Sequence, residues 1–237
     1  MKKITSATRR AINDFNMIED GDIIAVGVSG GKDSLTLLTA LAAIRNYLPQ
    51  KFEIKALTLD MGFEGCSTAD IAYYCEKLGV EYIVKKTEIA KIIFDIRKEK
   101  NPCSLCAKMR RGALHEFAAE HSCNKVALGH HFDDVIETFF LSLFYEGRIS
   151  CFDAVSHLER AQITLIRPLI YVEENDIIGY ARRTSLPIMH NPCPADKHTK
   201  REYIKQLLHS LELENKDLRK RVFTAVKNGL LLTNPDF

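Results

Sequence analysis

Ile23-Ile24-Ala25-Val26-Gly27-Val28 is a short apolar run typical of a buried strand, and it leads directly into Ser29-Gly30-Gly31-Lys32-Asp33-Ser34. Residues 34–47 have the apolar spacing of a helix. Glycines let the backbone turn tightly between a strand and a helix, where N–H groups can face an anion at the helix N-terminus. The stretch therefore predicts a phosphate-binding loop.

This loop differs from two common nucleotide-binding patterns. A Walker A loop has Gly six residues before the Lys and Ser or Thr directly after it, whereas Val26 and Asp33 stand at those positions here. The Gly-x-Gly-x-x-Gly dinucleotide pattern does not fit either. The simplest alternative is a glycine turn in which Lys32 and Asp33 are solvated.

Strand-like and helix-like segments alternate along the rest of the chain. This alternation predicts an α/β fold with a Rossmann-like parallel sheet, helices on both faces, and ligands beyond the carboxyl ends of the strands. We also expect a short helix at the N-terminus and a helical tail from Thr199 onward. The expected strands are 52–59, 81–84 and 125–128, and the expected helices are 67–78, 109–121 and 134–144.

Composition sets the broad class of protein. The 237 residues are 46% hydrophobic and 27% charged, which suits one sizeable core. A net charge of +2 is too small to indicate nucleic-acid binding by itself, so any such surface must be local. No apolar run is long enough to cross a bilayer, and we expect a soluble cytoplasmic protein without a membrane partner.

Two carboxylates follow two histidines in Gly129-His130-His131-Phe132-Asp133-Asp134, directly after an expected strand. One of the two acids could simply cap the helix that follows. Their place at the mouth of a sheet that already carries a phosphate loop favours a catalytic or Mg²⁺-holding role for at least one. Asp60 lies in Leu59-Asp60-Met61-Gly62-Phe63, at the end of another expected strand. We expect this turn to contact the ribose and adenine of ATP.

Seven cysteines, an odd number in ordinary globular sequence, indicate reduced thiols or metal ligation. Cys103 and Cys106 form a Cys-x-x-Cys in a loop expected to enter a helix, and Cys193 stands between two prolines. This spacing serves zinc, redox pairs and iron–sulfur clusters alike. A zinc site would need a fourth ligand, such as His115 or His190. If Cys103 and Cys106 formed a redox pair, Cys193 would lie outside that pair. The remaining cysteines are expected to be core or incidental thiols: Cys66, Cys75, Cys123 and Cys151.

Taken together, these motifs resemble the tRNA 2-thiocytidine synthetase family of PP-loop ATP pyrophosphatases. The resemblance runs from Val26 to about Cys193. Beyond the phosphate loop it is carried by Cys103-Ser104-Leu105-Cys106 with Met109-Arg110-Arg111-Gly112, by Ala127 to Asp134, by Phe144-Tyr145-Glu146-Gly147, and by Ile166-Arg167-Pro168-Leu169. His190 departs from the pattern, because family members often carry a second cysteine there.

The resemblance implies an activity and its site. ATP, with Mg²⁺, adenylates the C2 oxygen of a cytidine in the tRNA anticodon loop, and sulfur delivered through a [4Fe–4S] cluster replaces that oxygen. A cysteine desulfurase or another donor supplies the sulfur, and the enzyme forms a homodimer. The implied catalytic residues are Lys32, Asp33, Asp133 and Asp134; the implied ATP-binding residues are Ser29, Gly30, Gly31, Lys32, Asp33, Ser34, Asp60, Gly129 and His130; and the implied cluster ligands are Cys103, Cys106 and Cys193.

The resemblance also divides the chain and suggests where RNA binds. An N-terminal helix (1–20) precedes the PP-loop domain (21–190), and the third-cysteine loop and helical tail follow (191–237). Lys108, Arg110 and Arg111 are the expected tRNA contacts, with Arg182, Arg183, Lys197, Lys200 and Arg201 as further basic groups.

Three alternatives compete with this interpretation. The same chemistry could act on another tRNA base or a small molecule. A nucleotide- and cluster-binding sensor would bind ATP without releasing pyrophosphate, and the four residues expected to be catalytic argue against it. An amine-adding PP-loop ligase would need no cluster, and the three cysteines argue against that.

Overall fold

The protein is built on a six-stranded sheet in the order β3-β2-β1-β4-β6-β5. The computed structural model describes residues 1–63, 68–97, 102–189, 193 and 200–231, so Cys66, His190 and Lys197 lie outside the described residues. The strands are β1 (Ile23–Gly27), β2 (Glu53–Asp60), β3 (Glu81–Lys86), β4 (Lys125–Ala127), β5 (Val155–Leu158) and β6 (Ile163–Ile166).

The strand order reverses beside β1. The chain moves outward from β1 to β2 and β3, and then returns to place β4 on the other side of β1, with Val26 opposite Ala127. The loops after β1 and β4 consequently leave the sheet side by side, at the point where open α/β sheets bind ligands. The expectation of a parallel α/β sheet is confirmed, although β5 at the edge runs antiparallel to β6.

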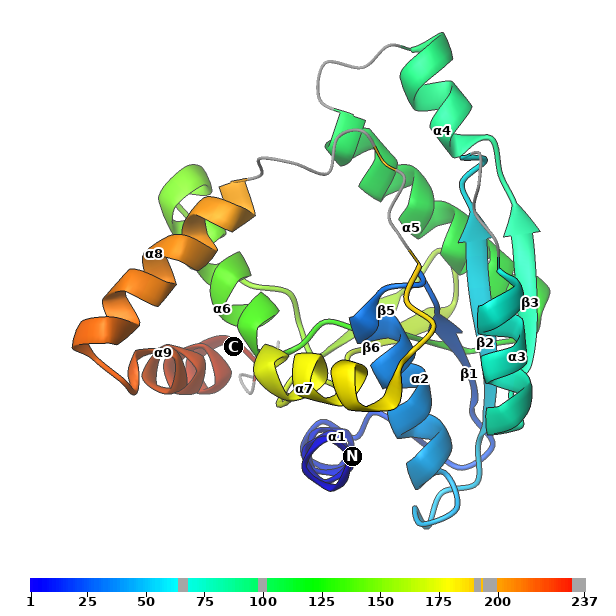
Figure 1. The fold of residues 1–237 in the computed structure, drawn as a ribbon, viewed down its shortest axis with the longest axis horizontal. Coiled ribbons are helices and arrows are strands. Elements are labelled where there is room, and N and C mark those ends of the chain that lie inside the picture. Colours follow the sequence, from blue (N-terminus) through cyan, green and yellow to red (C-terminus); the bar gives the residue numbers. More distant parts are fainter. Residues whose placement is uncertain (64–67, 98–101, 190–192, 194–199, 232–237) are drawn as a thin grey trace.

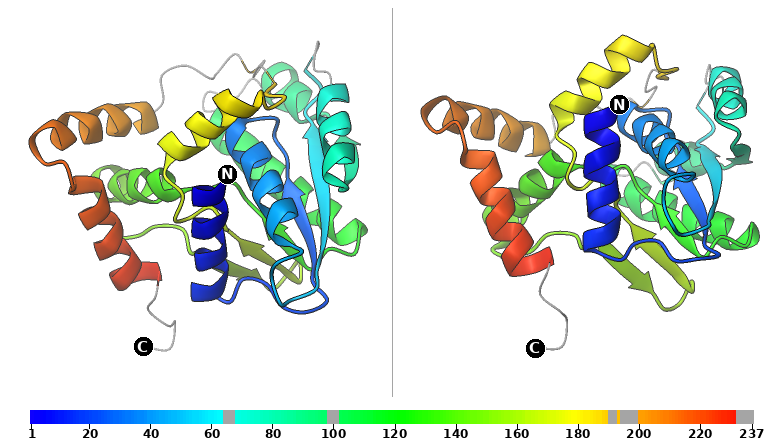
Figure 2. Two further views of the ribbon diagram at one scale, coloured as in Figure 1. Left: turned by 60° about the horizontal axis from the view of Figure 1, so that its bottom comes forward. Right: turned by 90° about the horizontal axis from the view of Figure 1, so that it is seen from below.

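The sheet is covered on both faces, but unequally (Figures 1 and 2). One face packs against α1 (Lys2–Asp14), α2 (Lys32–Ile44), α3 (Ala69–Leu78) and α7 (Glu174–Thr184). The other face packs mainly against α5 (Pro102–Glu120), which buries Phe117 over Leu57 and Val126. Along β1 the side chains alternate between the two cores, as a pleated strand requires: Ile24 and Val26 join the first, and Ala25 the second.

The remaining helices complete the two ends of the molecule. Beside the sheet, α6 (Phe132–Leu141) and η2 (Ser142–Glu146) pack with α8 (Lys200–Glu214), α9 (Leu218–Val226) and η3 (Lys227–Leu231), and Phe132 stacks on Phe223 at 4.5 Å. After β3 come α4 (Ile89–Lys91) and η1 (Ile92–Ile96). One hydrophobic core contains residues of α1, α2 and α9 together. The expected division of the chain into an N-terminal helix, a PP-loop domain and a tail stays a prediction. None of the helices in the described part of the chain has the length and apolar character needed to cross a bilayer.

The cysteine pair lies inside a helix, and the expected loop is wrong at this point. Helix α5 is described from Pro102, so that Cys103 and Cys106 occupy its first turns. Proline suits the first helical position because its φ angle is already helical and no N–H partner is needed there. Residues three apart on a helix share one face, so the two thiols lie on the same side of α5.

We expect Phe117→Ala to lower the free energy of unfolding by about 3–5 kcal/mol, because this 3%-exposed ring holds α5 to the sheet. Urea denaturation followed by circular dichroism measures the change. Leu213→Ala, at a largely exposed position of α8, should alter stability by less than about 0.5 kcal/mol. Equal losses in the two variants would contradict the placement of α5.

Candidate active site

The phosphate loop takes a backbone shape that requires glycine. Gly30 has φ +79°, and a Cβ added there would come within 2.8 Å of the Met189 sulfur. Met189 in turn donates its backbone N–H to the Gly30 carbonyl at 2.9 Å. A larger residue at position 30 would therefore strain the loop and push away the segment that lies over it.

Side-chain hydroxyls hold the loop closed. The Ser29 N–H donates to Ser34 Oγ at 3.2 Å, and Ser34 Oγ donates to the Gly31 carbonyl at 3.0 Å. Among the described residues, no side chain caps the N-terminus of α2, which begins at Lys32. The first N–H groups of α2 are consequently available to an anion, as the sequence predicts.

The loop after β4 approaches the phosphate loop closely at Gly129. A Cβ on Gly129 would lie 3.1 Å from the Asp33 carbonyl carbon and 3.2 Å from the Ser34 nitrogen, both backbone atoms. Only a residue without a side chain allows this contact. The contact brings the His130–Asp134 segment against the first turn of α2.

A set of acids surrounds a buried histidine at this contact. The backbone N–H of His131 donates to Asp134 Oδ2 at 3.0 Å. The ring nitrogen Nε2 of His131 lies 3.4 Å from that same oxygen and 3.7 Å from Asp33 Oδ1. His131 is only 5% exposed. Asp33 and Asp134 thus both present carboxylate oxygens near one imidazole nitrogen, His131 Nε2, and carboxylate oxygens are a donor type suited to Mg²⁺.

Asp133 bonds to α7 and α9, and its Oδ2 also lies 3.9 Å from His131 Nδ1. Its Oδ2 accepts the Glu174 N–H at 2.7 Å, and its Oδ1 accepts Arg219 Nη1 at 2.7 Å. Both oxygens therefore have protein donors, and the carboxylate ties three helices together. A catalytic role for Asp133 stays a prediction.

Lys32 lies in a chain of ion pairs that reaches the tail. Its Nζ is 3.0 Å from Asp33 Oδ1 and 3.1 Å from Glu174 Oε1, and Glu174 Oε2 is 2.6 Å from Lys205 Nζ on α8. Burial alone would lower the pKa of Lys32, but the two carboxylates outweigh it and raise that pKa. Burial opposes ionisation of Glu174, yet Lys205 and Lys32 lower its pKa to about 2.

A second cation of α8 reaches the acids after β4. Arg201 Nη1 donates to Asp134 Oδ1 at 3.1 Å and to the buried Glu137 Oε2 at 3.0 Å. Burial raises the pKa of Glu137, and Arg201 opposes that shift. Sequence reasoning gave Glu174, Lys205 and Arg219 no role and treated Arg201 only as a possible RNA contact, because charged residues in tail helices usually face solvent.

His130 is held neutral in an apolar pocket. Its ring packs on Phe152 at 4.8 Å, and the Arg167 guanidinium lies 4.9 Å from the centre of the same Phe152 ring. Burial, followed by the charge of Arg167, lowers the pKa of His130 to about 4. Asp60 lies at the same edge of the sheet, where its Oδ1 accepts the Gly62 N–H at 2.9 Å in a tight turn.

The cysteines project beyond the edge of the sheet that carries the phosphate loop. Leu114 of α5 contacts Gly27 at the end of β1, since a Cβ there would lie 3.0 Å from its Cδ2. Cys106 comes two turns earlier on the same helix, about 12 Å along its axis. Burial raises the pKa of the Cys106 thiol. Arg110 opposes this rise, whereas Cys103 and Cys193 add to it.

The donor set suits a cluster bound by three thiolates. Its members are cysteines only, and Cys103 and Cys106 lie three residues apart on one face of α5. Among the residues that the structure describes, no group of three or more His, Cys, Asp or Glu side chains is arranged to hold a metal ion. His115 and the exposed side chains of Lys108, Arg110 and Arg111 lie further along the same helix.

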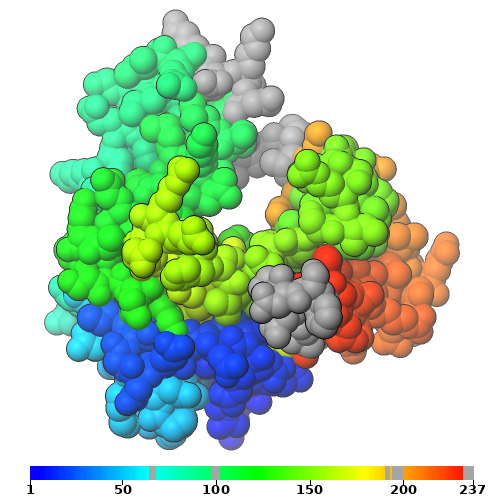
Figure 3. Space-filling model, turned by 180° about the vertical axis from the view of Figure 1, so that it is seen from behind, coloured from blue at the N-terminus to red at the C-terminus, as the bar shows by residue number. Residues whose placement is uncertain are grey.

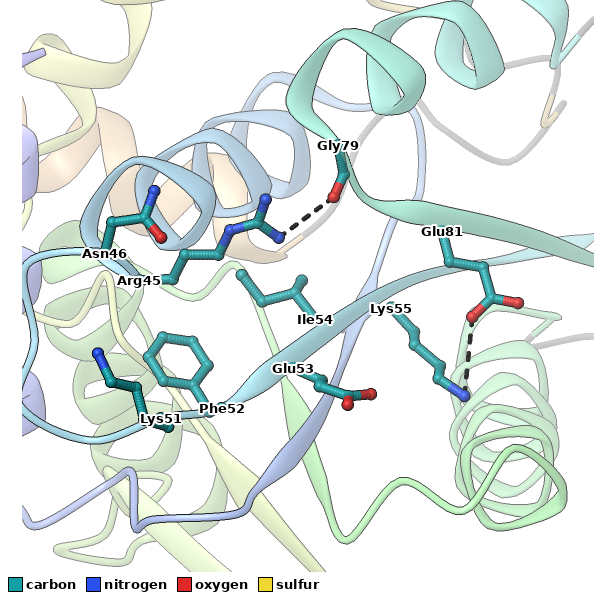
Figure 4. Close-up of a pocket in the computed structure, with 9 residues that line it drawn as sticks. All are labelled: Arg45, Asn46, Lys51, Phe52, Glu53, Ile54, Lys55, Gly79 and Glu81. Carbon is teal, nitrogen blue, oxygen red and sulfur yellow. Dashed lines mark hydrogen bonds and ion pairs between the residues drawn. The ribbon is translucent and has the colours of Figure 1, made fainter.

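A surface groove of about 470 Å³ lies at the opposite edge of the sheet, where β2 and β3 begin (Figure 4). Arg45 there donates to the Gly79 carbonyl at 3.2 Å, and Lys55 Nζ is 3.7 Å from Glu81. These cations are already paired within the groove. It is separate from the phosphate loop and the cysteines.

The glycine loop does not follow the Walker A pattern. It lies where the strand order reverses between β1 and β4, next to the carboxylates of Asp33 and Asp134. These features define a nucleotide-binding α/β domain of the PP-loop class. Residues 3–211 match the family described as PP-loop domain, and the chain belongs to it. Among curated proteins it is 41% identical to the tRNA-cytidine(32) 2-sulfurtransferase of Geobacter metallireducens, over 96% of this chain and 90% of the relative. The chain belongs to the family of tRNA-cytidine(32) 2-sulfurtransferases.

Solved structures support the fold. A U34-tRNA thiolase from Methanococcus maripaludis, with its [4Fe-4S] cluster, superimposes with a TM-score of 0.77 at 23% identity, covering 95% of this chain and 78% of that one. An NH3-dependent NAD synthetase from Campylobacter jejuni gives 0.51 at 20% identity, covering 96% and 91%. The Rossmann-like PP-loop architecture expected from the sequence is thereby confirmed.

Gly129→Ala should weaken ATP binding by about tenfold or more, because the added methyl must displace the backbone of Asp33 and Ser34. Isothermal titration calorimetry measures the affinity. Gly112→Ala is the matched control, since nothing lies within 4 Å of its added Cβ, and it should bind ATP as the wild type does. Wild-type affinity in Gly129→Ala would contradict the close approach of the two loops.

His130 predicts a specific dependence of stability on pH. Because its folded pKa of about 4 lies below the ordinary value of 6.5, protonation favours the unfolded chain, and stability falls as pH drops from 6.5 to 4. We expect His130→Gln to remove a loss on the order of 3 kcal/mol over this range, measured by urea denaturation at each pH. The exposed His209→Gln should keep the wild-type profile.

Proposed function

We propose that this chain is an ATP-dependent sulfurtransferase that adenylates the C2 oxygen of cytidine 32 in tRNA and replaces it with sulfur, giving 2-thiocytidine. Relatives that match 96% of this chain supply the substrate, because they are named for this reaction. The observation that carries the proposal is the placement of two features at one edge of the sheet: the glycine loop with the uncapped N-terminus of α2, and the pair Cys103 and Cys106 in the first turns of α5.

The phosphate loop supports the first step. The N–H groups at the start of α2 and the Lys32 ammonium bind the β- and γ-phosphates, and Asp33 and Asp134 hold Mg²⁺ beside His131. The C2 oxygen of the cytidine attacks the α-phosphorus, the bond to the bridging oxygen breaks, and pyrophosphate leaves. Lys32 neutralises the negative charge that this step places on pyrophosphate.

Sulfur transfer completes the reaction. A sulfur nucleophile attacks C2, the carbon–oxygen bond breaks, and AMP leaves with the former C2 oxygen. Cys103, Cys106 and Cys193 would hold a [4Fe–4S] cluster, which, when bound, supplies an iron position for the sulfur to be transferred. Burial raises the pKa of the Cys106 thiol overall, and Arg110 beside it opposes that rise and would support the thiolate that such ligation requires.

Further proposals concern the partners of this chain. Lys108, Arg110 and Arg111 contact the phosphates of tRNA, since all three are exposed on the cysteine helix. A cysteine desulfurase or another donor delivers sulfur, the working form is a homodimer, and the reaction takes place in the cytoplasm. Light scattering of the purified enzyme, and sulfur transfer from a purified desulfurase, test the dimer and the donor.

Lys32→Met should slow pyrophosphate release about 100-fold or more, because it removes a cation aimed at the leaving group. The matched variant Lys205→Met removes the other cation bound to Glu174 but leaves the loop intact, and its rate should stay within about tenfold of the wild type. Pyrophosphate release in the presence of tRNA measures both. Equal losses would assign the effect to the Glu174 network instead of the loop lysine.

The modified nucleosides of total tRNA test the function as a whole. In a strain lacking this protein, mass spectrometry should show loss of 2-thiocytidine, restored by the wild-type gene but not by Cys106→Ala. Cys123→Ala, which removes a buried core thiol outside the site, should restore it. An unchanged content of 2-thiocytidine would overturn the proposal, and loss of a different thiolated nucleoside would redirect it to another base.

A further inference from the structure

An unusual apolar stretch follows α6. All seven residues from 143 to 149 are exposed, and they include Phe144 (52% exposed), Tyr145 (44%) and Ile149 (73%). Large apolar side chains exposed singly are common, but a run of this kind marks a surface that binds something. The stretch covers most of η2 and the residues after it.

Basic groups surround these rings. Lys200 at the start of α8 places its Nζ 4.3 Å from the centre of the Tyr145 ring, and Arg148 is exposed within the stretch itself. Tyr203, 57% exposed, follows Lys200 by three residues and therefore lies on the same side of α8. We call Phe144, Tyr145, Arg148, Lys200 and Tyr203 the aromatic patch; Glu146 is the acid among them.

The elements that carry the aromatic patch border the same opening as α5. Figure 3 shows a hollow through the molecule, edged by α5 in green, the β5–β6 segment in yellow-green and the end of α6 with η2 in lime. Helix α6 begins at the acids of the active site and carries η2 outward, so Tyr145 lies about 15 Å along the helix axis from Asp134. Helix α5 and η2 thus lie on opposite sides of this opening.

We propose that the aromatic patch binds the unpaired bases of the tRNA anticodon loop, by stacking on Phe144, Tyr145 and Tyr203, while Arg148 and Lys200 contact the adjoining phosphates. This inference rests on the proposed function and adds the surface that presents the cytidine. Single-stranded RNA is recognised by aromatic side chains that stack on splayed bases, together with cations that follow the backbone. The cation beside Tyr145 makes an acidic partner the best match for this surface.

The chain offers a matched control for the stacking contact. On α3, Lys77 Nζ lies 4.2 Å from the centre of the exposed Tyr73 ring, almost the same pair as Lys200 and Tyr145. Helix α3 packs on β3 at the other end of the sheet, away from η2 (Figure 1). An effect of a tyrosine or lysine as such would appear in both pairs.

Binding of a labelled anticodon stem-loop RNA, followed by fluorescence anisotropy, tests the proposal. Tyr145→Ala should weaken binding about tenfold, Tyr145→Phe should keep wild-type affinity, and Lys200→Ala should reduce the slope of log K against log salt by about 0.7–0.9. Tyr73→Ala and Lys77→Ala should match the wild type. A fully paired RNA of the same length, without a loop, should bind all variants equally.

Three results would overturn the proposal. The first is unchanged RNA affinity in Tyr145→Ala, and the second is an equal loss of RNA affinity in Tyr145→Ala and Tyr73→Ala. The third is loss of the dimer in Tyr145→Ala, measured by light scattering, which would assign the patch to contact with a second copy of the chain. Thiolation by the wild-type enzyme is measured on the same RNA. If the wild type thiolates the loop and Tyr145→Ala binds normally, only the surface is wrong. If the wild type does not thiolate, the proposed function itself fails.

Discussion

The contact between the Gly129 backbone and the first turn of α2 determines the geometry of the site. Two loops leave the sheet from neighbouring parallel strands, and the missing side chain at Gly129 lets one lie directly on the other. As a result, His131 lies close to both Asp33 and Asp134, next to the uncapped N-terminus of α2. A side chain at position 129 would separate the acids from the loop they serve.

Once these acids lie together, their charge has to be balanced. Carboxylates at short range raise each other's pKa unless cations neutralise them. In this structure the tail provides those cations: Arg201 pairs with Asp134 and Glu137, Arg219 with Asp133, and Lys205 with Glu174. Helices α8 and α9 are therefore part of the site's electrostatics.

The sequence predicts the parts of the site that depend on local backbone chemistry. The phosphate loop and the Gly129–Asp134 segment could be found because glycine, lysine and paired acids after a strand form local patterns. Glu174 and Lys205 could not, since their roles arise from a contact between α7 and α8 that no spacing encodes. The β5–β6 hairpin was missed for a related reason: Val155-Ser156-His157-Leu158 is too short and polar for a strand signal. The helical position of Cys103 depends on Pro102, and proline is compatible with both a loop and the first turn of a helix.

The central claim is that the C2 oxygen of the cytidine becomes bonded to the α-phosphorus of ATP. The most direct test uses a tRNA whose cytidine 32 carries ¹⁸O at C2, followed by mass spectrometry of the AMP released during thiolation. The account predicts that the label appears in the phosphate group of AMP, one atom for each cytidine converted. Unlabelled AMP, with ¹⁸O recovered in water or pyrophosphate, would contradict it.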